Sequence, residues 1–290
     1  MRTVLTTVGL VASMLLTSRV ATAQFTAYGL SRNQSGAQQL VRFNTSNPAA
    51  ATVVGLTGTS LLSMDFRPAT GTLVGTDGAG LFTVDVNTGV ATRTATMTSA
   101  ITGPLALDFN PTVDRIRMIS ASGTNLRVNP NTGDAIVDGA YRDAVGDPNA
   151  TATPSFTAAG YTFNDTDPNT GTTLFTIDEP LGNLVRIGSP NGGDVFTVGS
   201  LGLGPRAGVT GFDIVTVGLM NTAFITTSSM GNSRLYTLDL TTGAASLTGS
   251  FGGTGIEALA IQTVPEPATV GMIAVGLLGV VVARRRRNTT

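Results

Sequence analysis

The sequence predicts an all-β protein: a five-bladed β-propeller of four-stranded blades, closed by its C-terminal strand and flanked by an N-terminal signal peptide and a C-terminal hydrophobic helix. Three observations lead to this prediction. Gly, Thr, Ser, Asn and Asp are abundant, while Val, Ile, Leu and Phe come in short runs, a composition typical of β-proteins. A hairpin pattern recurs along the chain. The first repeat also lacks a strand, which the last segment before the tail can supply.

The recurring hairpin is clearest at residues 81–85, where a strand of alternating apolar and polar residues precedes an Asn-Thr-Gly turn. Residues 126–129 and 235–239 repeat it, and residues 40–44 and 174–178 are weaker copies. Alternation on both sides of a glycine-containing turn is typical of β-hairpins. A second strand pair precedes three of these hairpins, so each unit contains about four strands in roughly 40–60 residues, the period of propeller blades.

The two ends of this array complement each other. The first unit has three expected strands, near residues 27–30, 39–43 and 52–55, and a lone strand is expected at residues 256–261. Pairing the two ends would close the ring and remove exposed sheet edges. An open β-sandwich or an irregular solenoid is the alternative. Residues 140–163 break the repeat and are expected to form a long polar loop, a candidate functional face.

Residues 1–23 have the features of a secretory signal peptide. Arg2 precedes the apolar residues 4–16, and Ala21 and Ala23 form a small-x-small cleavage site that places the mature start at Gln24. A buried N-terminal helix is the alternative. The domain of unknown function is therefore expected at residues 24–263.

Residues 264–290 have three parts in a fixed order. Val264, Pro265, Glu266 and Pro267 come first, an uncharged apolar segment follows at residues 268–283, and Arg284, Arg285, Arg286 and Arg287 end it. A terminal positive cluster favours a cytoplasmic C-terminus. This order resembles the PEP-CTERM sorting signal of Gram-negative bacteria. The resemblance implies transient anchoring in the inner membrane, recognition by an exosortase-type protease, and release to the cell surface or extracellular matrix. A plain C-terminal anchor is the alternative.

Composition excludes several classes of function. Residues 24–267 contain eleven arginines, no lysine and all 18 carboxylates, a net charge of −7 (11 − 18), so no nucleic-acid partner is expected. Cysteine, histidine and tryptophan are absent. The absence of histidine removes the usual general base and every Ser-His-Asp or Cys-His arrangement. These absences predict that the chain is not an enzyme.

Arg115, Arg117 and Arg127 form the densest basic set of the domain. Arg115 and Arg117 are two residues apart on an expected strand and therefore share a face. Guanidinium groups bind carboxylates and other anions, so these residues are the candidate anion-binding site. The alternative is an ion-pair network that holds the third blade together.

Two sets of oxygen ligands are candidates for other chemistry. Asp165, Asp167 and Asn169 alternate as in calcium loops, but the spacing departs from an EF-hand, and a polar turn is the alternative. Calcium is the one cofactor considered, and otherwise none is expected. Asp65, Asp108 and Asp213 recur at equivalent positions of three units. Carboxylates near a propeller axis could serve a glycosidase, although a residue repeated in several blades is usually structural.

A longer motif indicates a family for the domain. Residues 107–117 read LDFNPTVDRIR and residues 125–133 read NLRVNPNTG, which resembles an uncharacterised group of secreted bacterial domains. The resemblance spans residues 26–261 and implies the fold and secretion, without an activity. We therefore expect an exported surface or matrix protein with a binding or scaffold role, and extracellular polysaccharide or surface proteins as partners. A carboxylate-based glycosidase and a membrane-tethered structural domain are the alternatives.

Overall fold

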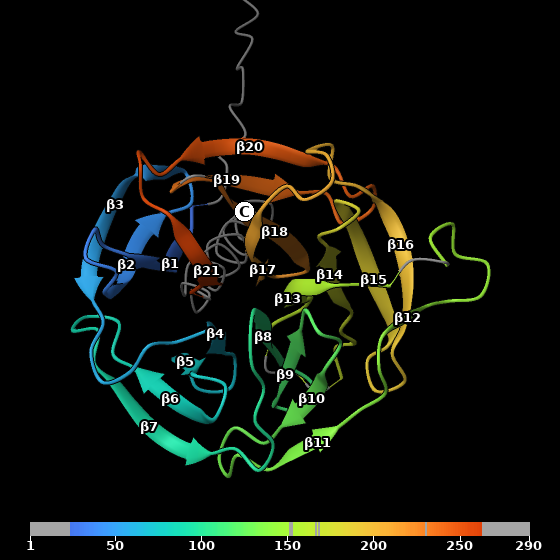
Figure 1. The fold of residues 1–290 in the computed structure, drawn as a ribbon, viewed down its shortest axis with the longest axis horizontal. Helices are drawn as coiled ribbons and strands as arrows, with labels where there is room; N and C mark the ends of the chain where they lie inside the picture. The colour runs from blue at the N-terminus through green and yellow to red at the C-terminus, as the bar shows by residue number, and fades with distance from the viewer. Residues whose placement is uncertain (1–23, 151–152, 166, 168, 230, 263–290) are drawn as a thin grey trace, which may run out of the picture.

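The computed structural model describes residues 24–150, 153–165, 167, 169–229 and 231–262, and every regular element within them is a β-strand. Five sheets stand around a central axis as the blades of a propeller (Figure 1). This arrangement confirms the predicted fold class. No helix within the described ranges is long and apolar enough to cross a membrane. The expected signal peptide and the expected C-terminal helix lie outside the described residues.

The blades follow one another along the chain. Blade 1 contains β21 (Ile256–Ile261), β1 (Thr26–Arg32), β2 (Gln38–Asn44) and β3 (Asn47–Gly55). Blade 2 contains β4 (Ser63–Arg67), β5 (Thr72–Thr76), β6 (Gly80–Val84) and β7 (Ala91–Thr96). Blade 3 contains β8 (Leu105–Asn110), β9 (Arg115–Ser120), β10 (Asn125–Val128) and β11 (Ala135–Val137).

Blade 4 contains β13 (Phe156–Tyr161), β14 (Leu174–Asp178), β15 (Asn183–Ser189) and β16 (Asp194–Ser200), with β12 (Arg142–Asp143) added in parallel at its outer edge. Blade 5 contains β17 (Val209–Val217), β18 (Met220–Ser229), β19 (Asn232–Leu238) and β20 (Ala245–Ser250). The first strand of each order, β21, β4, β8, β13 and β17, lies nearest the axis and packs against its neighbours around the ring (Figure 1).

The ring closes as the sequence predicts. β21 pairs antiparallel with β1, with Ala27 opposite Ile261 and Leu30 opposite Ala258. The last described strand therefore completes the first blade and leaves neither end of the array as an open sheet edge.

The recurring turn glycines are explained by contacts between blades. Gly133 has φ +78, and a Cβ atom there would lie 2.2 Å from the carbonyl oxygen of Thr96 at the end of blade 2. Gly89 has φ +71, and its Cβ would lie 2.1 Å from the carbonyl oxygen of Gly55 in blade 1. Both positive φ and the close approach of the neighbouring blade require glycine at these positions.

Two details in blade 4 differ from the sequence prediction. Residues 174–178 form β14, the second strand of the blade, whereas the true counterpart of the other hairpins is β15–β16. The expected loop at residues 140–163 contains β12 and also β13, the innermost strand. The prediction was wrong there because β13 begins after a long polar stretch and lacks the Asp that blades 2, 3 and 5 carry on their innermost strand.

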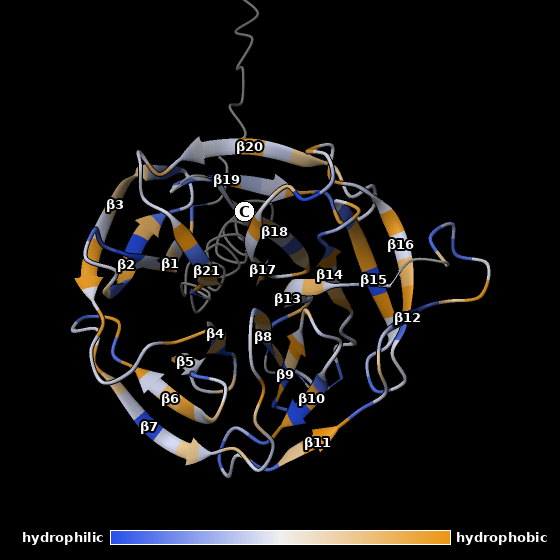
Figure 2. Ribbon diagram, viewed as in Figure 1, coloured by the Kyte–Doolittle hydropathy of each residue, from blue (hydrophilic) through white to orange (hydrophobic). Residues whose placement is uncertain are grey.

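The hydrophobic core consists of layers between neighbouring blades. One layer joins blades 1 and 2 and contains the rings of Tyr28 and Phe66, whose centroids are 5.6 Å apart. A second joins blades 4 and 5 through residues such as Ile177 and Ile225. Outer strands such as β7 and β20 carry mixed, largely polar side chains (Figure 2). Burial of apolar side chains between the blades makes the ring a rigid support for the residues at its axis and between its blades.

Candidate functional site

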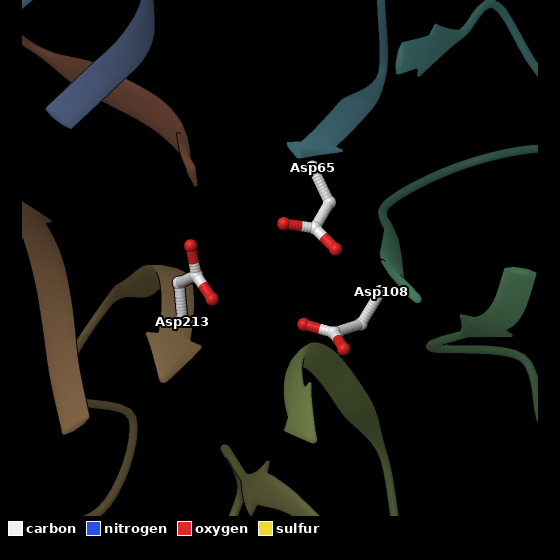
Figure 3. Close-up of side chains that lie close together, drawn as sticks. All are labelled: Asp65, Asp108 and Asp213. Atoms are coloured by element: carbon white, nitrogen blue, oxygen red, sulfur yellow. The ribbon is translucent and has the colours of Figure 1, made fainter. Parts of the chain in front are cut away.

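Three aspartates meet at the propeller axis. Asp65 on β4, Asp108 on β8 and Asp213 on β17 point toward one another (Figure 3), and one carboxylate oxygen of each lies within 4.8 Å of the others. Their exposed fractions are 4%, 1% and 2%. Residues predicted from equivalent repeat positions are thus brought together in space.

Each of these carboxylates links its own blade to the next one. Asp65 Oδ2 accepts a hydrogen bond from the Phe109 N–H of blade 3 at 2.9 Å, and Asp108 Oδ1 accepts one from the Tyr161 N–H of blade 4 at 3.1 Å. Asp213 Oδ2 accepts one from the Ile261 N–H of blade 1 at 2.5 Å. The repeated Asp therefore has a structural role, because it satisfies a buried backbone donor of the neighbouring blade.

Blades 1 and 4 carry Ala260 and Gly160 at the same position, so they cannot make this link. The donors left over are satisfied from within the next blade: Asp65 Oδ1 accepts from the Phe66 N–H and Asp213 Oδ1 from the Ile214 N–H, both at 2.6 Å. A Cβ atom at Gly160 would lie 2.9 Å from Cγ1 of Ile214. The Ile214 side chain thus occupies the space that a side chain at position 160 would need.

Burial controls the protonation of the three carboxyl groups. Desolvation raises the pKa of Asp65 to about 7, against the two backbone hydrogen bonds that lower it. Desolvation also raises the pKa of Asp108, and the charges of Asp65 and Asp213 raise it further. The pKa of Asp213 is raised by desolvation and by Asp65. Three ionised carboxylates at this distance repel one another, so protons or a cation must compensate part of their charge.

The triad could hold a metal ion, since it offers three carboxylate oxygens and no other chemistry. Among the described residues the three groups accept five backbone hydrogen bonds. All three groups are also buried, whereas a glycosidase needs two carboxyl groups that can flank a glycosidic bond. The geometry gives the glycosidase alternative no support.

The predicted arginines lie in a different place, a pocket of about 250 Å³ between blades 3 and 4. The lining residues include all three arginines and no carboxylate; they are Asn110, Val113, Arg115, Ile116, Arg117, Arg127, Tyr161, Ser189, Pro190 and Asn191. Arg117 lies directly opposite Arg127 on the neighbouring strand and opposite Asp108 on the other side. This row of charged residues extends from the axis outward along the face of blade 3 that meets blade 4.

Part of this basic set forms an ion-pair network. Arg117 Nη1 donates to Asp138 Oδ2 and to Asn125 Oδ1, both at 2.7 Å, and its Nη2 donates to Asn191 Oδ1 of blade 4 at 2.7 Å. Arg127 Nη2 lies 3.3 Å from the second oxygen of Asp138. The Arg117 and Asp138 side chains are only 4% and 7% exposed. Two arginines thus share one carboxylate, which leaves the network with an excess positive charge.

Three buried donors of the pocket-lining residues have no hydrogen-bond partner within the described part of the chain. They are Nε of Arg117, Nε of Arg127 and the hydroxyl of Tyr161. Burial raises the pKa of Tyr161, whereas the charge of Arg117 and the approach of the Arg117 and Asn110 side chains to its hydroxyl lower it, although neither approach has good hydrogen-bonding geometry. A buried donor without an acceptor costs free energy, and all three of these donors belong to residues that line the pocket.

The calcium candidates form a local turn. Asp165 Oδ1 accepts from the Asp167 N–H, and Asp167 Oδ1 accepts from the Asn169 N–H, each at 2.9 Å. The neighbouring insertion is held in place by Asp147, whose oxygens accept from the Thr197 N–H at 2.6 Å and from the Thr197 hydroxyl at 2.9 Å. In both places these carboxylate oxygens accept hydrogen bonds from backbone N–H groups and so fix the shape of the turn or loop.

Sequence reasoning missed Tyr161, Asn191, Asn125 and Asp138. Tyr161 lies on β13, which the sequence prediction treated as part of a loop. Asn125 is 1% exposed and joins blade 3 to blade 4 by donating to the Gly139 and Pro190 carbonyls at 2.9 Å. No local pattern assigns them to the site, because Tyr161 and Asn191 lie in another blade and Asp138 is 21 residues from its partner Arg117. The run of proline, asparagine and two glycines at residues 190–193 was the only available signal of a turn.

Comparison with known families identifies the domain. The sequence pattern of the Domain of unknown function (DUF4394) matches residues 39–260, which is more than half of the chain. The chain belongs to the DUF4394 family. In this DUF4394 protein a PEP-CTERM protein-sorting motif follows at residues 263–287, which confirms the predicted combination. No curated protein matches the chain.

Several solved structures are similar to this DUF4394 protein at low sequence identity. A Bacteroides thetaiotaomicron protein of unknown function is 14% identical, with a TM-score of 0.49, over 78% of this chain and 58% of that one. TolB from Acinetobacter baumannii is 14% identical, with a TM-score of 0.43, over 83% and 67%. A Lactobacillus plantarum protein is 11% identical, with a TM-score of 0.41, over 82% and 99%. The chain thus spans less than two thirds of the first of these relatives.

Proposed function

We propose that this DUF4394 protein is displayed at the cell surface or in the extracellular matrix, where its propeller binds an acidic ligand. The sorting motif at residues 263–287 implies export, transient membrane anchoring and an exosortase-type protease as partner. The motif begins two residues after β21 ends, so cleavage there would leave all five blades intact. A tethered structural domain is the alternative, and it requires that the tail stays uncut.

The blade 3–blade 4 pocket is the proposed binding site. The observation that carries this proposal is the set of three unpartnered donors, Nε of Arg117, Nε of Arg127 and the Tyr161 hydroxyl. An anion gains most from such donors, because hydrogen bonds between charged groups are stronger than neutral ones. The pocket also concentrates positive charge in a domain whose net charge is negative.

The ligand that fits best is the carboxylate of one acidic sugar unit in an extracellular polysaccharide. A volume of about 250 Å³ is below the usual range for drug-sized ligands, so the pocket would take a single small unit. Asn110, Asn191 and Ser189 offer partners for hydroxyl groups, and Val113 and Pro190 offer apolar contact. Both the carboxylate and the hydroxyls of a uronic acid would then find complementary groups.

Titration calorimetry with glucuronate, glucose and inorganic phosphate tests this proposal. Glucuronate should bind, and Tyr161→Phe should weaken binding roughly tenfold or more, since a hydrogen bond to a charged group contributes about 1.5–3 kcal/mol. Arg234→Gln, which changes an arginine of blade 5, is the matched control and should bind as the unchanged protein does. Binding of phosphate alone would make the site a general anion site. Equal affinity of Tyr161→Phe for glucuronate would refute the assignment.

Intact mass of the protein from its native host tests the sorting part of the proposal. A species that ends near Val264–Pro267 and is found outside the cell is the expected result. A full-length species that remains in the membrane would contradict processing and favour the tethered alternative. Replacing Arg284, Arg285, Arg286 and Arg287 should abolish processing, because the positive cluster sets the orientation of the tail.

Calcium would find a better donor set at the axis than in the exposed turn of residues 165–169. The triad contributes three buried carboxylate oxygens within 4.8 Å, and calcium takes oxygen ligands at about 2.3–2.6 Å. Calorimetry with millimolar calcium at pH 8 measures this directly. Heat of binding that Asp108→Ala removes would assign the ion to the axis, and no heat in the unchanged protein would exclude both sites.

A further inference from the structure

The hairpin between β17 and β18 ends in an exposed apolar tip. Leu219 is 84% exposed, Met220 73% and Val217 45%. The ladder continues to the tip, where Val217 pairs with Met220, and the Asn221 carboxamide oxygen behind it accepts from the Phe163 N–H and the Thr216 hydroxyl at 2.8 Å. The tip is therefore held in a fixed position by its base, with apolar side chains outermost.

This tip lies on the same side of the propeller as the point where the chain leaves blade 1. β17 and β21 are the innermost strands of adjacent blades, packed against each other, and the Ile261 N–H donates to Asp213 Oδ2 at 2.5 Å. The chain enters each of these strands from the loop that follows the preceding blade, so the two strands point the same way. Val217 follows Asp213 by four residues, which extends β17 by about 13 Å beyond that contact.

The apolar segment of the tail begins only a short length of chain beyond the end of β21. Ala268, where the apolar segment of the sorting signal begins, follows Ile261 by seven positions, and this length of chain can span at most about 25 Å. The hairpin covers about 13 Å of that distance in the same direction. The apolar segment therefore starts at most about 25 Å from the end of β21, and a linker that spans about 13 Å along this direction would bring the tip level with it.

We propose that the β17–β18 tip rests on the outer surface of the lipid bilayer while the tail anchors the chain. Residues 217–220 carry no charge, which favours the lipid interface over a charged protein surface. Three side chains alone would bind a membrane weakly, but the anchor raises their effective concentration at the bilayer. The inference depends on the anchoring that the sorting motif implies and not on the blade 3–blade 4 pocket.

This contact would set how the anchored protein stands on the membrane. Two fixed points, the tip of blade 5 and the end of β21 in blade 1, would hold the side of the ring with the β17–β18 turn against the bilayer. The residues between β21 and the apolar segment of the tail would then lie between the ring and the lipid surface. An anchor alone would leave the ring free to rotate about its linker.

The absence of tryptophan from the chain allows a direct test. Leu219→Trp places a single fluorophore at the tip, and Leu247→Trp places one on β20 of the same blade, where the leucine is 61% exposed. Each full chain is reconstituted into phosphatidylcholine vesicles that contain lipid with a nitroxide near the headgroup. Quenching of the tip tryptophan at least twofold above that of the β20 tryptophan is the expected result.

Equal quenching at the two positions, or none at the tip, would overturn the proposal. Met220→Trp repeats the test at the neighbouring tip residue in case one substitution disturbs the hairpin. If the tip tryptophan changes its emission only when the exosortase-type protease is present, the tip binds that protein and not lipid, and the proposal is also overturned. These outcomes do not depend on whether glucuronate binds the pocket.

Discussion

The propeller axis and the pocket between blades 3 and 4 both gather buried charged groups, but they differ in how fully those groups are partnered. At the axis, five backbone N–H groups donate to the three carboxylates. In the pocket, three buried donors have no partner among the described residues. The charges at the axis satisfy their own surroundings and hold the fold together, whereas the unsatisfied donors of the pocket are where the proposed ligand would bind.

Arg117→Ala should cause the largest loss of stability, because Arg117 belongs to the partnered part of the pocket. Its loss leaves Asp138 with one distant arginine and removes the bond to Asn191 of blade 4. Breaking a buried ion pair in this way should lower the free energy of unfolding by about 3–5 kcal/mol. Urea unfolding measures this change in the free energy of unfolding. A loss below about 1 kcal/mol would mean that Arg117 does not stabilise the fold and would leave ligand binding as its role.

The axis should make stability depend on pH. Asp65 ionises near pH 3.8 when unfolded and at about pH 7 when folded, so the folded state holds the proton longer. This stabilisation is complete below about pH 4 and is lost as the pH rises through 7. Thermal unfolding from pH 4 to pH 8 measures the change. Asp65→Ala should flatten the curve, and an equally steep curve in this variant would assign the effect to other groups.

Gly160→Ala should cost less, about 1–3 kcal/mol, because the added methyl group forces the Ile214 side chain to move. Gly171→Ala is a suitable control, since no atom lies within 4 Å of the added group there. Thermal unfolding of the two variants gives the comparison. If both variants melt at the same temperature, contact with Ile214 of blade 5 does not explain why position 160 is glycine.

Tyr161→Phe should have the smallest effect on stability. Its hydroxyl is buried without a partner, so removing it should leave the free energy of unfolding unchanged or raise it by up to about 1 kcal/mol. Urea unfolding of this variant beside Arg117→Ala sharpens the contrast within one pocket. A large loss would mean that the hydroxyl supports the fold, and the distinction between the two regions would fail.

Much of the fold could be predicted because its signals are local. The hairpins around Gly89 and Gly133 recur with the same turn, and the spare strand at residues 256–261 complements an incomplete first unit. The aspartates of the triad were also recognisable as equivalent positions. Blade 4 was harder, because Gly160 replaces the Asp and Tyr161 follows it unmarked. The pocket could not be completed from sequence, since Asn125 and Asn191 acquire their roles only when two blades meet.

The pairing of β21 with β1 has a consequence for the order of events during export. The two strands that close the ring are about 225 residues apart, and synthesis proceeds at about 5–20 residues per second, so β1 waits about 10–45 s for its partner. Because the sorting motif follows β21 directly, it is synthesised immediately after the strand that closes the ring. Completion of the ring and synthesis of the sorting motif are thereby linked in time, and a chain truncated before residue 256 would expose the open edge of β1 to aggregation.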